Sequence, residues 1–495
     1  MNQESRGEDE MPAKNGIQYC ERIDAQTVPC WYKGVLLLGK RSEHIAFSGL
    51  MKTQMNMYDL QFDPEVTDRM LYASPADGKP VGMSFLPPTH ANDLRRRREA
   101  MTIWAQTHHG FLGRSPDYMN TAIMAFYTAA DLLNELSPQY ADNLKNYYAY
   151  CRDNDITLSH AFIQPYASKL SGQLDTTEDA IAAKVVDRTD EGLIINGAFM
   201  MATQAATSDE IFVYPSPSPA PFDDENPFSF SFAVPNDLPG ISLISRDTYA
   251  DESKYNYPLS SRYEEMDNIV IFDHVLVPHD RIFFAGDEQM SSTLFKESHF
   301  HIHAGHQVLS RYIAKTEFVL GTIQLLIDTL DLNYEAHVVE KTARALAGLE
   351  SLKALAIAAE AGAIPDGRGF ILPAPKPLMA ANLIYPKLYP EMIEILQLLS
   401  SSGMIMVPQE EDFHSGSAES LNLYLKGSDM ESKERNALFR LIWELGAGSF
   451  GGRQTQFERF FFGNTITVSN RLYSAGSYDE SQRERVRQFL ANHVR

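Results

Sequence analysis

The spacing of apolar residues along this 495-residue chain changes twice. Before residue 150, apolar side chains recur three and four positions apart, as in residues 122–133, which is the period of an amphipathic helix. After about residue 155, short β-branched and aromatic runs alternate with turn residues. Beyond residue 290 the helical period returns. The chain is therefore expected to form a helical region, a β region and a second helical region.

Five runs in the middle region are predicted to be β-strands. They are residues 184–187, 192–195, 211–214, 228–234 and 268–272. Because they are short and separated by turn signals, they favour a small antiparallel β domain that ends near Pro278. Four helices are expected after it and would pack as a bundle. They span residues 310–331, 336–362, 385–401 and 431–446.

These changes predict three domains. An N-terminal helical domain would span residues 1–154, a middle antiparallel β domain 155–284, and a C-terminal helical bundle and oligomerisation domain 285–495. The length suits about three domains, and a hydrophobic fraction of 44% is ample for a large core. The fold class expected from periodicity is α+β, mostly α.

Charge limits the partners of the chain. Its 43 Lys and Arg residues against 65 Asp and Glu residues give a net charge of −22, which disfavours nucleic acid and anionic membrane surfaces. The most apolar helical stretch, residues 318–330, is interrupted by Gln324 and Asp328 and is shorter than the roughly 20 residues of a spanning helix. We therefore expect no nucleic-acid partner and no membrane partner.

The cysteines indicate the compartment. Cys20, Cys30 and Cys151 are an odd number in a large chain, and no two have metal-ligand spacing. The N-terminus lacks the basic and apolar regions of a secretory signal. A reducing cytoplasm is predicted, and no metal site.

Residues 446–451 match the dinucleotide-binding pattern G-x-G-x-x-G. That pattern requires a strand before it and a helix after it. Residues 438–445 have the pattern of an amphipathic helix instead. A close-packed bend between two helices is therefore expected, and the chain has no evident nicotinamide site.

A sharp bend is predicted at residues 113–120. Pro116 biases the residue before it away from the helical region, so Arg114 and Tyr118 should project from the ends of the bend. On spacing alone, the favoured interpretation is that Arg114 pairs with Asp117 or another local carboxylate and Tyr118 is ordinary core. The alternative is that Arg114 and Tyr118, together with His160, hold a phenol.

Several motifs occur in a distinctive order along the chain. They span residues 93–98, 113–120, 159–165, 258–267, 275–278, 306–308, 385–390 and 450–463. Together they resemble the flavin-dependent 4-hydroxyphenylacetate 3-hydroxylase oxygenase family, from about Tyr32 to the C-terminus. The resemblance implies an acyl-CoA dehydrogenase-like fold: a helical N-terminal domain, a middle β domain and a C-terminal helical bundle.

The resemblance also implies the chemistry. Reduced FAD and molecular oxygen would hydroxylate a phenol ortho to its hydroxyl group, giving a catechol. Arg114, Tyr118 and His160 would contact the phenolic hydroxyl, where a cation and hydrogen-bonding groups stabilise a developing oxyanion. Because no nicotinamide site is evident, a separate NAD(P)H:flavin reductase would supply reduced FAD. A homo-oligomer, either dimer or tetramer, is implied as well.

Two further groups of site residues follow from the resemblance. The flavin would be lined by Gln164, Tyr166, Ala167, Ser168, Lys169, Thr203, Asn464, Thr465, Ile466 and Thr467. Tyr166 and Lys169 depart from the glutamine and arginine that are common in the family. Ser216 and Pro217 would lie at the distal end of the substrate. Because acidic residues 223–225 follow them, a neutral or amine-bearing phenol deserves equal weight with an anionic arylacetate.

Two alternatives stay open. The first is a flavin-dependent lyase of the 4-hydroxybutyryl-CoA dehydratase type, which resembles the same fold and adds an iron–sulfur cluster with three cysteine ligands and one histidine. His303 could be that histidine, but Ser310 stands where a cysteine would follow. The second is a non-enzymatic helical scaffold, which gives no reason for Arg114, Tyr118 and His160 to accompany the flavin motifs.

Overall fold

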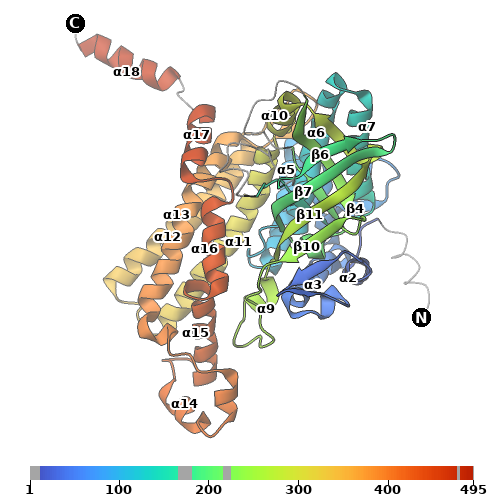
Figure 1. Ribbon diagram of the computed structural model, residues 1–495. Coiled ribbons are helices and arrows are strands. Elements are labelled where there is room, and N and C mark those ends of the chain that lie inside the picture. The colour runs from blue at the N-terminus through green and yellow to red at the C-terminus, as the bar shows by residue number, and fades with distance from the viewer. Residues whose placement is uncertain (1–11, 166–180, 216–224, 477–479, 494–495) are drawn as a thin grey trace.

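The computed structural model describes residues 12–165, 181–215, 225–476 and 480–493. Helices at the start of the chain, a β layer and a C-terminal bundle follow one another in the expected order, and Figure 1 shows the bundle beside the β layer. This confirms the α+β, mostly α class and the expected order of a helical region, a β layer and a helical bundle. The domain boundaries at residues 154 and 284 stay a prediction.

The first part of the chain is mostly helical. Its helices are α2 (Gly16–Asp24), α3 (Ile45–Asp59), α4 (Thr67–Met70), α5 (Ala91–Thr107), α6 (Pro116–Thr128) and α7 (Pro138–Asp153), and β3 (Leu71–Ala73) and β4 (Pro80–Gly82) form a small hairpin. Helix α6 begins at Pro116, where a missing N–H costs nothing, and every residue of it except Tyr127 is buried. It packs against α11 and β5, so its polar side chains need internal partners.

The β layer consists of two main sheets. The six-stranded sheet has the order β2 (Val35–Leu36), β1 (Cys30–Tyr32), β10 (Ile241–Ser245), β11 (Asp267–Pro278), β7 (Gly192–Thr203), β6 (Lys184–Arg188). The four-stranded sheet has the order β12 (Ile282–Gly286), β9 (Asn226–Pro235), β8 (Glu210–Val213), β5 (Leu158–Ala161). All five predicted runs are strands, and the apolar faces meet through Phe199, Phe230, Phe232 and Phe272.

The expectation of a purely antiparallel layer was wrong. Strand β1 pairs in parallel with β10, and β5 pairs in parallel with β8. Parallel neighbours need a long connection between them. Here β1 comes from the first helical region, and the chain between β5 and β8 passes through β6 and β7 of the other sheet.

The C-terminal part is a helical bundle. Its helices are α10 (Glu288–Glu297), α11 (Phe300–Thr329), α12 (Ala336–Ala361), α13 (Pro375–Ser400), α14 (Ala418–Tyr424), α15 (Ser432–Gly446), α16 (Ser449–Phe460), α17 (Thr465–Gly476) and α18 (Glu480–His493), with a hairpin of β13 (Ile364–Pro365) and β14 (Ile371–Leu372). Helix α13 starts at Pro375, earlier than the expected residue 385, because buried Leu378 and Ala381 extend its packing towards the N-terminus. In Figure 1, α18 projects away from the bundle.

Candidate active site

The bend before α6 is held by a distant carboxylate. The backbone N–H groups of Gly113 and Arg114 donate to the two oxygens of Glu265, at 2.9 and 2.7 Å. Glu265 follows the short helix α9 (Ser260–Tyr263). Gly113 has no room for a β-carbon, which would overlap the ring of Phe457 on α16. Both contacts fix the backbone from which the Arg114 side chain projects.

The Arg114 side chain lies between aromatic rings. Its guanidinium carbon is 4.6 Å from the centroid of the Tyr118 ring and 4.3 Å from that of Phe461. Within the described part of the chain, no carboxylate pairs with the guanidinium, and its buried Nε has no hydrogen-bond partner. The expected ion pair with Asp117 was wrong, because Asp117 accepts hydrogen bonds from Ser115 at 2.5 Å and from Gln307 on α11 at 3.0 Å.

Tyr118 and His160 reach the same place from two elements. Tyr118 lies in the first turn of α6 and His160 on β5, and their ring centroids are 6.3 Å apart. Both are buried, and His160 Nδ1 has no hydrogen-bond partner among the described residues. The structure therefore brings Arg114, Tyr118 and His160 together with polar atoms to spare. Their contact with a substrate stays a prediction.

Burial sets the protonation of this group. Burial, and then the charge of Arg114, lower the pKa of His160 well below its ordinary value, so the ring is neutral at pH 7. Burial raises the pKa of Tyr118 against the opposing effect of Arg114, so its hydroxyl keeps the proton. The site therefore combines one permanent cation with two neutral hydrogen-bonding groups.

Several aromatic residues complete the site, and the sequence reasoning assigned them no role. The ring of Tyr214 lies 4.8 Å from that of His160, and the rings of Phe300 and Phe461 lie 6.2 and 5.6 Å from that of Tyr118. Tyr214 comes directly after β8, whose parallel pairing with β5 brings it to His160. That pairing leaves no signal in the sequence.

The predicted flavin-lining residues fall in two places. Gln164 follows Ile163, which pairs with Met201, so Gln164 lies near the end of β7 where Thr203 is buried. Asn464–Thr467 instead begin α17, where Asn464 Oδ1 accepts from the Thr467 N–H and Ile466 is 73% exposed. Tyr166, Ala167, Ser168, Lys169, Ser216 and Pro217 lie outside the described residues.

A buried network of charges joins Thr203 to the bend. The Thr203 hydroxyl donates to Asp267 at 2.8 Å, and Arg453 on α16 donates to both oxygens of Asp267 at 3.1 and 3.0 Å. Arg453 Nη1 is 3.6 Å from Glu265, the carboxylate that holds Arg114. Despite the cost of burial, Arg453 and Arg246 lower the pKa of Asp267 below its usual range. The network is therefore ionised.

The glycine pattern at residues 446–451 is a bend between helices, as expected. Helix α15 ends at Gly446 and α16 begins at Ser449. A β-carbon on Gly451 would overlap the backbone of Leu445, so the glycine allows close packing at this turn. The strand that a dinucleotide-binding loop requires is replaced by α15.

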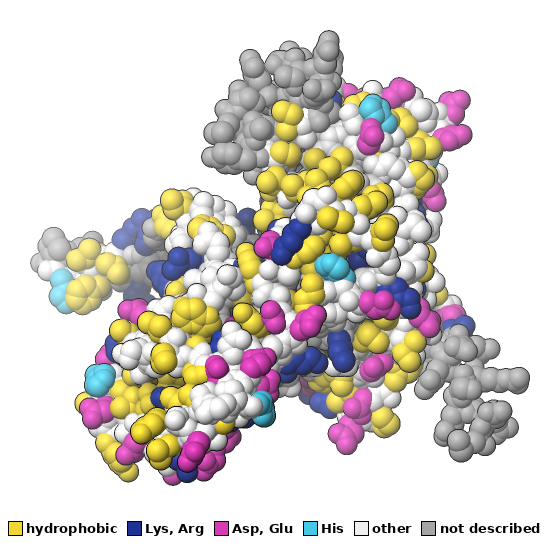
Figure 2. Space-filling model, turned by 60° about the horizontal axis from the view of Figure 1, so that its bottom comes forward, with side chains coloured by type: hydrophobic (Ala, Val, Ile, Leu, Met, Phe, Trp, Pro, Cys, Tyr) yellow, Lys and Arg dark blue, Asp and Glu magenta, His cyan; other side chains and the backbone are white. Residues whose placement is uncertain are grey.

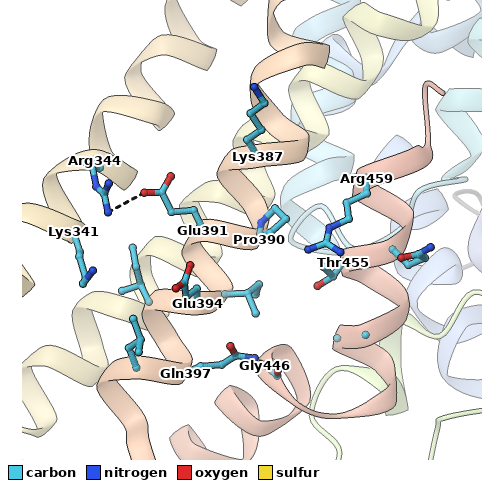
Figure 3. A pocket seen from close by; sticks show the side chains of 16 residues that line it. Lys341, Arg344, Lys387, Pro390, Glu391, Glu394, Gln397, Gly446, Thr455 and Arg459 are labelled. Atoms are coloured by element: carbon cyan, nitrogen blue, oxygen red, sulfur yellow. Dashed lines mark hydrogen bonds and ion pairs between the residues drawn. The ribbon is translucent and has the colours of Figure 1, made fainter. Parts of the chain in front are cut away.

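The bundle carries a large groove of about 880 Å³ away from Arg114, Tyr118 and His160. Figure 3 shows Lys341 and Arg344 on one side of it, Lys387 and Glu391 between, and Arg459 opposite. Volume alone would make this groove the active site. The buried unpaired atoms of Arg114 and His160 favour the cluster of Arg114, Tyr118 and His160 instead, because unsatisfied polar atoms in the interior are costly.

The described segments show neither a metal site nor a membrane-spanning helix. They contain no group of three or more His, Cys, Asp or Glu side chains placed to hold a metal ion. None of their helices combines the length and apolarity needed to cross a bilayer. On the face in Figure 2, acidic and apolar side chains are interspersed with basic ones.

Comparison with known proteins identifies the family. The pattern "4-hydroxyphenylacetate 3-hydroxylase N terminal" matches residues 15–284, and the corresponding C-terminal pattern matches residues 291–491. A probable 4-hydroxyphenylacetate 3-monooxygenase of Bacillus subtilis is 40% identical over 93% of this chain and 95% of its own length. The oxygenase component of 4-hydroxyphenylacetate 3-monooxygenase from Thermus thermophilus is 36% identical, with 97% of both chains covered.

Solved structures agree. The crystal structure of an oxygenase component of 4-hydroxyphenylacetate 3-monooxygenase, complexed with FAD and 4-hydroxyphenylacetate, has a TM-score of 0.89 and 36% identity, and the match covers 97% of this chain and 99% of that one. An archaeal 4-hydroxybutyryl-CoA dehydratase shares the fold with a TM-score of 0.84, at only 16% identity. These matches confirm the resemblance seen in the motifs: the chain belongs to the 4-hydroxyphenylacetate 3-hydroxylase family.

Proposed function

We propose that the chain is the oxygenase component of a two-component monooxygenase, which uses reduced FAD and oxygen to hydroxylate a phenol ortho to its hydroxyl group. The observation that carries the proposal is the meeting of Arg114, Tyr118 and His160 with unpaired Arg114 Nε and His160 Nδ1. A phenolic oxygen would satisfy both atoms. Relatives named as oxygenase components support the division of labour with a separate reductase.

The residues act on the phenol in distinct ways. Arg114 places a permanent positive charge where the ring oxygen gains negative charge, which makes the ortho carbon more nucleophilic. Neutral His160 can accept the phenolic proton or donate to the oxygen, and Tyr118 adds a hydroxyl. The rings of Tyr214, Phe300 and Phe461 exclude water.

The flavin would lie between the β layer and the bundle. Gln164 and Thr203 offer an amide and a hydroxyl there, and buried Arg453 Nη1 has no hydrogen-bond partner among the described residues, so the donor set fits a cofactor with polar ring edges and phosphates. Reduced FAD, when bound, supplies the electrons that activate oxygen. The roles of Asn464–Thr467 belong to the same proposal.

The substrate class is a small phenol. The names of similar proteins include monooxygenases of 4-hydroxyphenylacetate and of 4-nitrophenol. Because acidic residues 223–225 follow Ser216 and Pro217 in the sequence, phenols with a neutral or amine-bearing side chain belong in the test beside 4-hydroxyphenylacetate.

The chain would act as a homo-oligomer, a tetramer or a dimer, in the cytoplasm. Helix α18 supports association, since Val486, Phe489 and Leu490 on one of its faces are 58, 59 and 53% exposed.

The three cysteines of the chain are free thiols, which suits a reducing compartment. The three-domain division at residues 154 and 284 completes the proposal.

Labelled oxygen tests the reaction. Purified chain, a flavin reductase, NADH, FAD and ¹⁸O₂ are incubated with 4-hydroxyphenylacetate, tyramine and 4-nitrophenol, and products are analysed by mass spectrometry. We expect one labelled atom ortho to the hydroxyl group of at least one phenol, and no NADH oxidation without the reductase. An oxygen atom that comes from water, or hydroxylation of aromatic rings that carry no hydroxyl group, would contradict the proposal.

A further inference from the structure

Glu265 is a buried carboxylate whose two oxygens accept hydrogen bonds from the backbone of the bend before α6. It is 1% exposed, and besides the N–H groups of Gly113 and Arg114 it accepts from Gln204 Nε2 at 2.9 Å. Glu265 also forms an ion pair with Arg453, whose Nη1 lies 3.6 Å from Glu265 Oε2. Three donors and one cation therefore converge on a single side chain, which lies 151 positions from Arg114 in the sequence.

This arrangement separates the two halves of Arg114. Glu265 accepts a hydrogen bond from the backbone N–H of Arg114, whereas the guanidinium lies on the rings of Tyr118 and Phe461. A carboxylate on the guanidinium itself would compete with a phenolic oxygen. Glu265 thus fixes where the side chain starts without neutralising its charge through a direct ion pair.

The same carboxylate links the bend to the proposed flavin wall. Arg453 contacts both Glu265 and Asp267, and Asp267 accepts from Thr203. Gln204, the neighbour of Thr203, donates to Glu265 directly. Any shift of Glu265 would therefore change the position of Arg114 relative to Thr203, that is, of the phenol relative to the flavin.

We propose that Glu265 is a positioning residue for hydroxylation, which sets the distance between the phenol-binding group and the flavin wall. The inference rests on the proposed function. Transfer of an oxygen atom requires near-contact geometry, and a misplacement of about 1 Å can cost on the order of 10²-fold in rate. Reduced flavin that reacts with oxygen without reaching the ring would release hydrogen peroxide, so misplacement should appear as uncoupling.

Glu265→Gln tests the role with little change in shape. Glutamine keeps one acceptor oxygen but replaces the other with an NH2 group, which is itself a donor. At least one of the groups that donate to Glu265 therefore loses its partner. The matched control is Glu444→Gln. Glu444 is also buried and also accepts from two consecutive backbone N–H groups, those of Leu259 at 2.5 Å and Ser260 at 3.2 Å, but at the start of α9 instead of at the bend before α6.

Two measurements are compared between these variants. In single turnover with reduced FAD and the phenol identified above, Glu265→Gln should form about 10²-fold less catechol, with hydrogen peroxide in its place, whereas Glu444→Gln should stay coupled. Glu265→Asp, which restores the carboxylate, should recover part of the product. Hydrogen exchange at the peptide containing Gly113 and Arg114 should accelerate in Glu265→Gln and not in Glu444→Gln.

The outcomes separate the two claims. A wild-type chain that yields no catechol from any phenol contradicts the proposed function, while faster exchange in Glu265→Gln alone still supports the hold on the bend. A coupled wild-type chain whose Glu265→Gln variant is equally coupled overturns the positioning role. Equal uncoupling in both glutamine variants also overturns it, since any buried carboxylate would then serve.

Discussion

The guanidinium carbon of Arg114 lies 4.6 Å from the centroid of the Tyr118 ring, in stacking contact with a residue four positions along the chain. Arg114 belongs to the bend before α6 and Tyr118 to its first turn, so Pro116 between them sets their geometry. A cation over a ring face gains about 2 kcal/mol or more when water is excluded. The stack therefore holds the cation in place while its Nε stays unpaired.

Arg114→Lys should abolish most hydroxylation while the fold persists. Lysine keeps the charge but lacks the planar fork that can stack on rings and hydrogen-bond in a fixed direction. We expect a loss of roughly a hundredfold in single-turnover product formation, as for removal of one preorganised oxyanion donor. Arg435→Lys is the matched control, because Arg435 also stacks on a ring, that of Phe439 at 4.3 Å, on the remote helix α15. Equal activity of the two variants would refute the role of Arg114.

Tyr118→Phe should lower hydroxylation more than Tyr214→Phe does. Both rings border the site, but the Tyr214 hydroxyl already donates to Met119 Sδ at 3.6 Å. The Tyr118 hydroxyl is proposed to bond the phenol, so its removal deletes a contact to the reacting group. Single-turnover rates of the two variants, with thermal unfolding as a check on folding, decide between these positions. A larger loss in Tyr214→Phe would exclude the assignment.

His160→Gln should weaken the dependence of stability on pH. The pKa of His160 is well below that of an unfolded histidine, about 6.5. Below pH 6.5 the unfolded chain therefore binds a proton that the folded chain does not, and folding stability falls as the pH falls. Removing this histidine should reduce the slope by up to about 1.4 kcal/mol per pH unit between pH 6 and 5. Urea unfolding at several pH values measures it.

His303→Gln separates stability from function in the same experiment. The pKa of His303 is also well below its ordinary value because the ring is buried. Its replacement should flatten the pH dependence as His160→Gln does, but only His160→Gln should impair hydroxylation. Loss of hydroxylation in His303→Gln with hydroxylation retained in His160→Gln would contradict the assignment of His160 to the site.

The sequence predicted local features well because local features depend on near neighbours. The β-branched runs became β6, β7, β8, β9 and β11, and the glycine pattern at 446–451 became a bend between helices. Family motifs supplied Arg114, Tyr118 and His160, whereas spacing alone favoured an ion pair for Arg114 and a place in the ordinary core for Tyr118.

What the sequence missed depends on contacts between distant segments. Asp117 was the natural partner for Arg114 at three positions along, yet it faces Gln307, 190 positions away. Glu265 was visible only as part of a motif, because its hold on Gly113 and Arg114 crosses from the β layer to the first helices. Such pairings arise from packing and carry no local period.

Helix α18 should be an association surface between copies of the chain. Val486, Phe489 and Leu490 are three and four positions apart and so share one face of this helix. A lone helix of 14 residues is marginal in water, and all its described side chains are exposed. Cover from a second copy would bury the apolar face and stabilise the helix.

Sedimentation velocity should therefore give a dimer or tetramer at micromolar concentration, and Phe489→Asp combined with Leu490→Asp should shift the protein towards smaller species. Leu38→Asp, at a site 89% exposed outside the bundle, is the control and should leave the assembly intact. An assembly unchanged by the double substitution would exclude α18 as the contact.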